Sequence, residues 1–424
     1  MKVFWVIFYN VIVYPLIFLS GVVLSILQDK IRDSVTGKFS AINVLKNYFK
    51  QNAYNPNTYW FHASSLGEYY QIKPVLEGLK NIEPESRFLV SFTSPSGYNN
   101  AYSDAIDLKF YMPFDFPWSV SRALNIVRPK KVIFSSYDYW PNFIWISKLK
   151  GIYTNVFAFR LRASSLKRIP IIRNFFKNIY KSMSTIYTIS DQDRDLLNSV
   201  YGKKDMPPVK AMGNPRYDMV IQTAKIYDSY EKPSDYKRII IGSAHEEEEN
   251  ILIPSLVSLI NSYPHLKILY APHEPNSDEI ERIKNKFKEQ GILSTIFTKQ
   301  NDLTLPNDQL VIIGVVGVLS KLYWQSSIAY VGGGYSTGIH NVMEPAVAGV
   351  PVIFGPKYDH AHEADELLSS AGGFCIRDGD EFLSKISELI EDDDHLKICG
   401  LAAKDVIQRN SGSSEKIIRE IVHE

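Results

Sequence analysis

VGGGYSTGIHNVMEPAVAGVPVIFGP, residues 331–356, is the stretch of sequence that decides the fold. It joins one apolar run to the next through Gly332, Gly333 and Gly334, followed by a short segment that contains Asn341 and Glu344. A strand, a glycine-rich turn, a short helix and a second strand in this order predict one unit of a parallel α/β sheet. Glycines let backbone N–H groups approach a ligand, and Glu344 in a first helical turn could accept hydrogen bonds from ribose hydroxyls. A tight, capped turn without a ligand explains the same glycines.

Apolar runs and amphipathic stretches alternate on both sides of this segment. In the C-terminal half, strands are expected at 238–241, 267–271, 310–313, 328–331 and 351–354, and helices at 246–261, 278–290, 320–326, 342–349 and 363–370. In the N-terminal half, strands are expected at 58–62, 88–92, 109–112, 131–135, 156–159, 185–189 and 209–212, and helices at 68–80, 118–127 and 192–200. This alternation predicts two doubly wound, Rossmann-like domains facing a cleft, which is a GT-B-like α/β fold.

Breaks in the alternation set the expected domain boundaries. We expect an N-terminal membrane anchor helix, two Rossmann-like domains joined by a linker, and a C-terminal helix with room to pack back on the N-terminal domain. In chain order these parts cover residues 1–28, 29–215, 216–237 for the linker, 238–400 and 401–424. Ligands of such folds bind where the carboxyl ends of the strands meet.

The anchor is predicted from residues 3–27, which carry no charged side chain. At about 1.5 Å per residue this segment is long enough to cross a hydrocarbon core of about 30 Å. A helix lying in the membrane interface and a cleaved signal peptide are the alternatives, although the run is longer than a signal peptide normally has and no small-residue cleavage site follows. Lys30 and Arg32 slightly favour a cytoplasmic side after the anchor.

Four loop ends that follow expected strands carry candidate polar side chains. Glu68 in WFHASSLGE could take a proton from a hydroxyl, or could simply favour a helix start. Ser243 in GSAHEEEE is an expected N-cap that could also help to hold a phosphate. Asp138 in SYDYWPN and Arg216 in GNPRYD lie in loop ends that are more often turns than sites.

The composition excludes several classes of protein. Hydrophobic residues make up 45% of the 424 residues, which is typical of a globular chain. The net charge is 47 − 46 = +1, so no overall field attracts nucleic acid. Cys375 and Cys399 have no metal-binding or redox spacing. The acidic pair at 191 and 193 and the histidines at 360 and 362 resemble metal ligands, but helix capping and a loop explain them better, so no metal is predicted.

A basic, aromatic-rich stretch at 160–181 has two interpretations. It carries Arg173 and Lys177 among seven basic residues, interleaved with apolar side chains such as Phe175 and Phe176. Such a segment suits an anionic membrane surface or a phosphorylated lipid. A solvated helix whose apolar stripe faces the core fits the pattern equally well.

Taken together and in order, these motifs resemble the family of 3-deoxy-D-manno-octulosonic acid (Kdo) transferases of lipopolysaccharide assembly. The pieces are WFHASSLGE, SFTSPSGY, YMPFDFP, RPKKVIFSSYDYWPN, FRLRASS, GNPRYD, GSAHEEEE, GVVGVLSKLYWQSSIAYVGGG and GIHNVMEPAVAGVPVIFGP, and they run from about residue 30 to 400. The resemblance implies an inverting transferase without metal or cofactor that moves Kdo from CMP-Kdo to a lipid A precursor at the cytoplasmic face of the inner membrane, in contact with its phospholipid.

The resemblance also implies roles for particular residues. Glu68 would be the general base of an acceptor-binding N-terminal domain. The CMP site would lie in the C-terminal domain, around Ser243, residues 332–334, Asn341 and Glu344.

Some positions depart from the family pattern. Asp138 stands where the family usually has Glu, FRLRASS exchanges the expected Ser and Arg at positions 162 and 164, Ala244 stands where Thr is usual, and His273-Glu274 replaces an Arg-His pair. His273 is therefore a candidate for the contact with the cytidylate phosphate. Arg160, Arg216 and Asp138 are candidates for holding the Kdo carboxylate or the acceptor, since Arg forms bidentate pairs with carboxylates and phosphates. A GT-B transferase for a UDP-sugar and a membrane-tethered nucleotide-binding homologue without catalysis remain alternatives.

Overall fold

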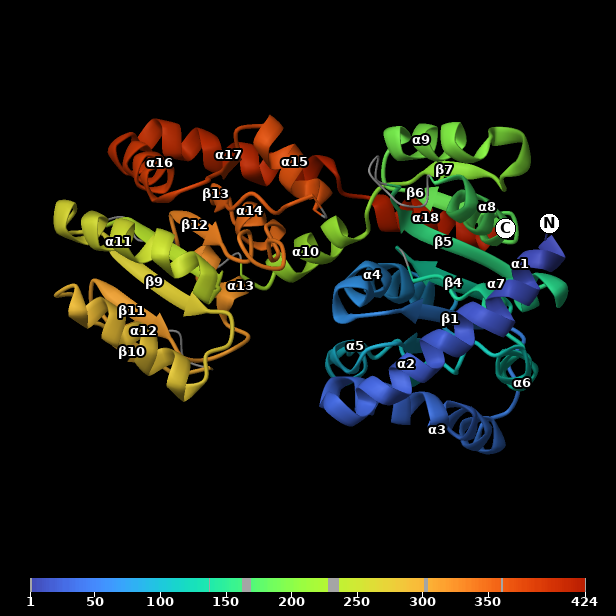
Figure 1. Ribbon diagram of the computed structural model, residues 1–424. Coiled ribbons are helices and arrows are strands. Elements are labelled where there is room, and N and C mark those ends of the chain that lie inside the picture. Colours follow the sequence, from blue (N-terminus) through green and yellow to red (C-terminus); the bar gives the residue numbers. More distant parts are fainter. Residues whose placement is uncertain are drawn as a thin grey trace. The chain divides into compact units, whose positions relative to one another are not determined.

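The computed structural model describes residues 2–136, 138–161, 169–227, 236–300, 304–359 and 361–423. The chain divides into two compact units. Unit 1 comprises Met1–Met219 and Gly412–Glu424, and unit 2 comprises Val220–Ser411. Both appear in Figure 1 as sheets flanked by helices.

Unit 1 is built on a seven-stranded sheet in which all paired strands are parallel, in the order β3-β2-β1-β4-β5-β6-β7. Its strands are β1 (Thr58–Ala63), β2 (Arg87–Phe92), β3 (Leu108–Tyr111), β4 (Lys131–Ser135), β5 (Tyr153–Phe159), β6 (Thr185–Thr188) and β7 (Val209–Ala211). Its helices are α1 (Lys2–Phe8), η1 (Tyr9–Val13), α2 (Tyr14–Leu27), α3 (Asp29–Gln51), α4 (Leu66–Ile82), α5 (Pro95–Asn100), α6 (Pro117–Val127), α7 (Pro141–Leu149), α8 (Pro170–Tyr180), α9 (Asp191–Tyr201), η3 (Lys203–Asp205) and α18 (Ser413–His423). The boundary between the two units falls within α10 (Arg216–Ala224).

The central strands of unit 1 are buried on both faces, as expected for a parallel sheet. Every residue of β1 is buried, and neighbouring side chains enter different cores. Trp60 packs with residues of α6, α7 and α8. Tyr59 and Phe61 pack on the opposite side with α4 and α18. Two layers of helices therefore cover the sheet, which is why the strand sequences are almost continuously apolar.

Unit 2 contains a second seven-stranded sheet, again with parallel pairing throughout, in the order β10-β11-β9-β8-β12-β13-β14. Its strands are β8 (Arg238–Ala244), β9 (Lys267–Pro272), β10 (Thr295–Phe297), β11 (Leu310–Ile313), β12 (Ile328–Val331), β13 (Val352–Phe354) and β14 (Gly373–Cys375). Its helices are α11 (Glu246–Ser262), α12 (Ser277–Glu289), α13 (Leu319–Trp324), α14 (Met343–Val347), α15 (His362–Ser369), α16 (Gly379–Glu391) and α17 (Asp393–Arg409).

The predicted fold class, two doubly wound GT-B-like units with an apolar N-terminal helix, is confirmed. The stretch predicted as a linker begins with α10, and its residues 228–235 lie outside the described part of the chain. Residues 401–424, predicted as one helix, divide between α17 and α18. The two are separated at Gly412, and Asp218 accepts hydrogen bonds from the backbone N–H groups of Gly412 and Ser414.

Strand order reverses at one point in each sheet, and these points position the candidate sites. In unit 1 the reversal lies between β1 and β4, and in unit 2 between β8 and β12. Open α/β sheets bind ligands beyond the carboxyl ends of the strands at such switch points. The loops that follow these four strands are therefore the expected places for ligand-binding side chains.

Candidate functional sites

Glu68 lies directly beyond β1, in the first turn of α4. Its Oε2 atom accepts hydrogen bonds from the backbone N–H groups of Ser64, at 2.6 Å, and Ser65, at 3.0 Å, and from the Ser64 hydroxyl. This is a capping box, in which an acidic residue at the third helical position satisfies the backbone donors that precede the helix. Among the described residues these bonds all go to Oε2, so Oε1 stays outside the capping network.

Asp138 forms the centre of a second polar group beyond β1 and β4. Its Oδ2 atom lies 3.0 Å from His62 Nε2 and accepts hydrogen bonds from Thr93 Oγ1 at 2.9 Å and Trp140 Nε1 at 3.3 Å. His62 is buried, and its Nδ1 lies 2.9 Å from the Ser91 hydroxyl. The imidazole is thus held from both sides, which fixes its orientation.

These two groups influence each other electrostatically. Burial raises the pKa of Glu68, and the nearby charge of Asp138 raises it further. Hydrogen bonds from Ser64 lower this pKa, but they do not outweigh the effect of burial. Burial is the largest influence on Asp138 and opposes its ionisation, but hydrogen bonds from His62 and Thr93, together with the charge of Lys38, outweigh it and lower the pKa of Asp138. Lys38 of α3 completes the group, with its Nζ 4.4 Å from the centre of the Trp140 ring. A carboxylate of raised pKa beside an ionised carboxylate is suited to accept a proton.

The predicted arginines lie at the ends of other elements. Arg160 follows β5, and its Nε atom lies 3.9 Å from Asp193 Oδ1. Arg216 begins α10, where its backbone N–H donates to Asn214 Oδ1 at 3.1 Å. The two positions named for the exchange in FRLRASS, 162 and 164, lie outside the described residues.

In unit 2, the loop after β12 packs backbone against backbone. A Cβ atom on Gly332 would lie 2.1 Å from the Ser243 carbonyl oxygen, and one on Gly334 would lie 2.5 Å from the Gly355 Cα. Gly333 has a φ of +94°, a conformation that side chains disfavour. These glycines are therefore required by the fold itself at the end of β12.

Gly332→Ala tests this requirement. We expect the free energy of unfolding to fall by about 3 kcal/mol, because the new methyl group meets fixed backbone rather than a flexible side chain. Gly291→Ala is the matched control, since Gly291 has open space around it and only a positive φ. It should cost about 1 kcal/mol. Equal denaturation midpoints for the two variants in urea would contradict the packing argument.

The predicted N-cap at Ser243 is wrong. Ser243 belongs to β8, has a φ of +55° and lies in a register irregularity against β9, so the strand continues past it. The N-cap of α11 is His245, whose backbone N–H donates to Glu248 Oε2 at 3.1 Å. The acidic run at 246–249 forms the first turn of α11, as predicted, and its buried Glu248 also accepts from the Tyr330 hydroxyl at 3.0 Å.

Three histidines gather beyond β8, β9 and β12. The rings of His245 and His273 stack with centroids 4.3 Å apart, and that of His340 lies 5.2 Å from His245 and 4.7 Å from His273. Their ligand atoms lie within 4.8 Å of one another, so they could hold a metal ion. The 2.8 Å between the Nε2 atoms of His245 and His340 is a hydrogen-bond distance, shorter than the roughly 3.4 Å that two ligands of a tetrahedral zinc ion keep. Imidazole N–H groups at such a place can equally hydrogen-bond an anion.

Asn341 and Glu344 form a pair at the start of α14. The Asn341 side-chain amide donates to Glu344 Oε1 at 2.8 Å, and its carbonyl oxygen accepts from the Met343 N–H at 3.1 Å. Glu344 lies in the first turn of α14, as predicted. Its charge adds to burial in raising the pKa of Tyr323.

Neither of the other metal-like patterns forms a comparable cluster among described residues. Asp193 caps α9 by accepting from the Ser190 backbone N–H at 3.2 Å, and Asp191 pairs with Arg194. His362 lies 3.3 Å from Glu366, whereas the position 360 falls outside the described residues. These contacts agree with the capping interpretation.

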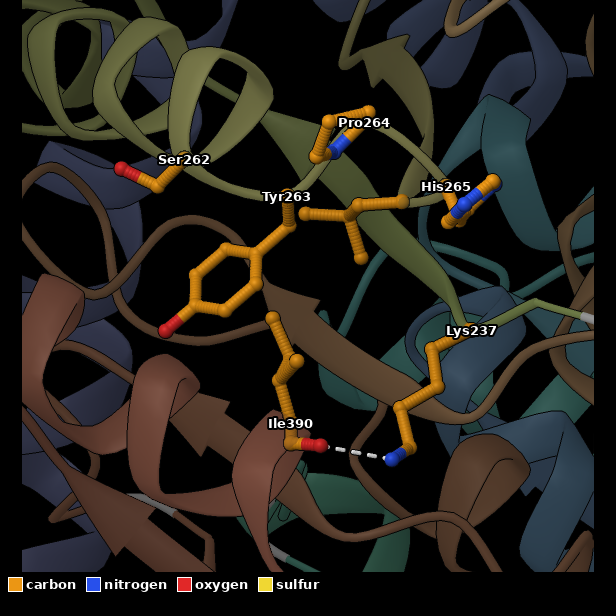
Figure 2. Close-up of a pocket in the computed structure, with 7 residues that line it drawn as sticks. Lys237, Ser262, Tyr263, Pro264, His265 and Ile390 are labelled. Carbon is orange, nitrogen blue, oxygen red and sulfur yellow. Dashed lines mark hydrogen bonds between the residues drawn. The ribbon is translucent and has the colours of Figure 1, made fainter.

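A hollow of about 210 Å³ lies at the other end of the unit 2 sheet (Figure 2). Its lining includes Lys237 and Leu266, which precede β8 and β9, so it opens at the amino ends of the strands. Lys237 Nζ donates a hydrogen bond to the Ile390 carbonyl oxygen at 2.6 Å, as Figure 2 shows. The hollow is therefore separate from the switch point and from the candidate site.

Most of unit 1 matches the model of a known family. Residues 40–219 match the family model described as 3-deoxy-D-manno-octulosonic-acid transferase (kdotransferase). This segment of the chain therefore resembles the Kdo transferase domain.

Relatives extend the similarity over most of the chain. The Kdo transferase of Aquifex aeolicus is 27% identical over 361 residues, covering 84% of this chain and 93% of that protein. That of Haemophilus influenzae is 26% identical over 380 residues, covering 86% of both chains. Among solved structures, UDP-GlcNAc 2-epimerase from Neisseria meningitidis has a TM-score of 0.61 at 13% identity and MurG from Acinetobacter baumannii 0.58 at 12%, each covering 87% of this chain and 100% of theirs. These two share the fold alone.

Several site residues escaped the sequence analysis. It named His273 but not its partners His245 and His340, and it missed His62 and Lys38 beside Asp138. The first three follow neighbouring strands of one sheet, and that position was the signal that could have united them. Lys38 comes from α3, before the first strand, and no local pattern connects it with Asp138.

Proposed function

We propose that this protein is an inverting glycosyltransferase that moves Kdo from CMP-Kdo to a hydroxyl of a lipid A precursor such as lipid IVA. The match of residues 40–219 to the Kdo transferase family carries this proposal. Similarity to the relatives over about 85% of the chain supports the same activity for the full protein. Transfer from a nucleotide-activated sugar also suits the GT-B-like fold.

In this proposal Glu68 is the general base. Its Oε1 atom removes the proton of the acceptor hydroxyl as the hydroxyl oxygen attacks the anomeric carbon of Kdo. The bond from that carbon to the CMP phosphate breaks, and attack from the face opposite the leaving group inverts the configuration. The capping bonds to Oε2 hold the carboxylate still, and the raised pKa makes it a stronger base than a solvated glutamate.

Unit 2 binds the donor. Glu344, oriented by Asn341, accepts hydrogen bonds from the ribose hydroxyls, and the backbone of Gly332–Gly334 lies close to the nucleotide. His273, with His245 and His340 beside it, donates to the phosphate, where negative charge develops as the sugar leaves. Arg160, Arg216 and Asp138 hold the Kdo carboxylate or the acceptor.

The protein acts at the cytoplasmic face of the inner membrane. The acceptor is a lipid, and within the described chain Val3–Leu27 is the one segment long and apolar enough to cross a membrane, with a mean hydropathy of 2.2. Membrane association through this segment, in contact with phospholipid, brings the enzyme to its acceptor.

Calorimetry with CMP and UDP tests the donor assignment. CMP should bind with at least tenfold higher affinity, because the site is proposed to be shaped for a cytidine monophosphate. Preference for UDP would instead indicate a UDP-sugar transferase.

The reaction is proposed to need no metal, because imidazole and backbone donors meet the charge of the leaving phosphate. Dialysis against EDTA should leave the rate of transfer within about twofold of the untreated enzyme. The histidine cluster makes this a demanding test. Loss of activity that zinc or magnesium restores would show that His245, His273 and His340 hold a metal ion.

A further inference from the structure

The N-terminal apolar segment is joined to unit 1 by buried polar contacts. Tyr9 donates from its hydroxyl to Asp115 Oδ2 at 2.9 Å, and the Tyr14 hydroxyl accepts from the Asp115 backbone N–H. Asn10 and Asn142 exchange two side-chain hydrogen bonds, at 3.0 and 2.8 Å. Asp115 is fully buried, and burial raises its pKa to about 7. Through these contacts the N-terminal segment packs against the rest of unit 1.

The backbone of the segment is adapted to this docking. Residues Tyr9–Val13 form one turn of π-helix, and the Tyr14 N–H donates to the Tyr9 carbonyl five residues earlier. A π-turn places residues five apart on the same face, so Tyr9 and Tyr14 both reach Asp115, with their rings 5.6 Å apart. Such single π-turns are rare and are often found at functional sites.

Contact continues along most of the segment. Trp5 packs against Phe175 of α8, with ring centroids 5.6 Å apart, and Phe18 packs against Phe114, before α6, at 5.1 Å. Residues 5 to 18 span about 20 Å of helix. In Figure 1, α1 and α2 run across unit 1 beside α7. The segment is thus attached lengthwise from Trp5 to Phe18.

The opposite face of the segment is apolar and exposed. Phe4, Ile7, Val11, Leu16, Leu19 and Val23 have exposed fractions between 57% and 67%. The exposed apolar area continues onto neighbouring elements, with Phe39 touching Phe18, Trp118 stacked on Phe116, and Ile171 on α8. A contiguous apolar area of this kind marks a membrane or protein interaction surface.

We propose that α1, η1 and α2 form an in-plane membrane foot: the segment lies lengthwise in one leaflet, its inward face held by unit 1, and does not cross the bilayer. This inference rests on the membrane association proposed above. The foot comprises residues 3–27.

Two physical costs exclude a crossing helix. If the helix crossed the bilayer while docked, exposed charges on the adjoining elements, such as Arg122, Lys148 and Arg173, would enter hydrocarbon, where charged side chains are strongly disfavoured. If it crossed undocked, Asp115 would lose the Tyr9 donor and Asn10 would enter lipid without Asn142. Leaving such polar groups unsatisfied is also unfavourable. An in-plane foot avoids both costs and buries the exposed face in lipid.

The foot also touches the loop that carries Asp138. Asn142 and Phe143 donate their backbone N–H groups to Asp115, the residue that Tyr9 holds, and the Tyr14 ring meets the edge of Trp140 at 6.3 Å. The candidate acceptor site is therefore fixed relative to the lipid surface through a few rigid contacts.

Topology mapping in sealed membrane vesicles tests the foot directly. Lys2→Cys and Lys30→Cys variants of the full chain are treated with a membrane-impermeant maleimide in inside-out and right-side-out vesicles, and labelled peptides are identified by mass spectrometry. This separates them from peptides with Cys375 and Cys399. We expect both new cysteines to react in the same vesicle orientation. Reaction from opposite sides would establish a spanning helix and overturn the proposal.

Flotation with phosphatidylglycerol–phosphatidylethanolamine vesicles supplies a second test. Leu16→Asp should lower the vesicle-bound fraction about tenfold or more, because the variant loses a leucine side chain that the lipid would bury and places a charge there instead. Leu293→Asp, the same change at an exposed leucine of unit 2, should bind like the parent. Equal binding of the three proteins, or no binding by any, would contradict the foot. Neither test uses transferase activity, so a failure here is distinguishable from failure of the proposed reaction.

Discussion

Glu68→Gln is expected to lower kcat for Kdo transfer by about 10²–10⁴-fold while leaving the affinity for CMP unchanged. Glutamine can still accept the hydrogen bonds of a capping box, so the start of α4 and the fold should persist. What the variant loses is a carboxylate able to take the acceptor's proton. The measurement is a single-turnover assay with CMP-Kdo and a lipid acceptor, together with calorimetry of CMP binding.

Glu85→Gln is the matched control, because Glu85 is exposed in the turn before β2. It should behave like the parent protein. The parent should also lose activity on acidification at a pH above the usual pKa of a glutamate, since the raised pKa keeps Glu68 protonated to higher pH. A Glu68→Gln protein that turns over at the parental rate would show that Glu68 serves only as a helix cap.

Glu344→Gln is expected to weaken binding of CMP and CMP-Kdo by roughly 10- to 100-fold. A hydrogen bond to a charged group contributes about 1.5–3 kcal/mol, and the amide cannot accept from both ribose hydroxyls while keeping its contact with Asn341. The affinities are measured by calorimetry. Transfer at saturating donor should change much less than the affinity, because the ribose contact is made equally before and during the reaction.

Glu281→Gln serves as the control for this variant, since Glu281 lies on α12 with its side chain 57% exposed and paired only with Lys284 among the described residues. A Glu344→Gln protein whose affinity for CMP equals that of the control would remove Glu344 from the nucleotide site.

The sequence predicted the fold well because parallel strands are buried on both faces and therefore read as continuous apolar runs. All seven strands of unit 1 were predicted within a few residues. In unit 2, Thr295–Phe297 and Gly373–Cys375 were missed, because three-residue strands at the edges of a sheet carry too few apolar positions to form a recognisable run.

The candidate sites were predicted less completely. Glu68 and Glu344 were placed in first helical turns, where the structure has them, because both follow a strand and a glycine- or serine-containing turn. The grouping of His245 with His273 and His340 depends on strand order, which one sequence does not reveal. Asn10 lies within the uncharged run at 3–27 that was predicted as an anchor, whereas its partner Asn142 lies 132 residues away. Long-range partners of this kind leave no local pattern.

Mass spectrometry of a lipid IVA acceptor, incubated with the purified protein and CMP-Kdo, measures the central claim. We predict that the acceptor gains the mass of one or more Kdo residues, that CMP appears in equal amount, and that the Glu68→Gln protein yields neither product. An acceptor of unchanged mass in the presence of folded, CMP-binding protein would contradict the account.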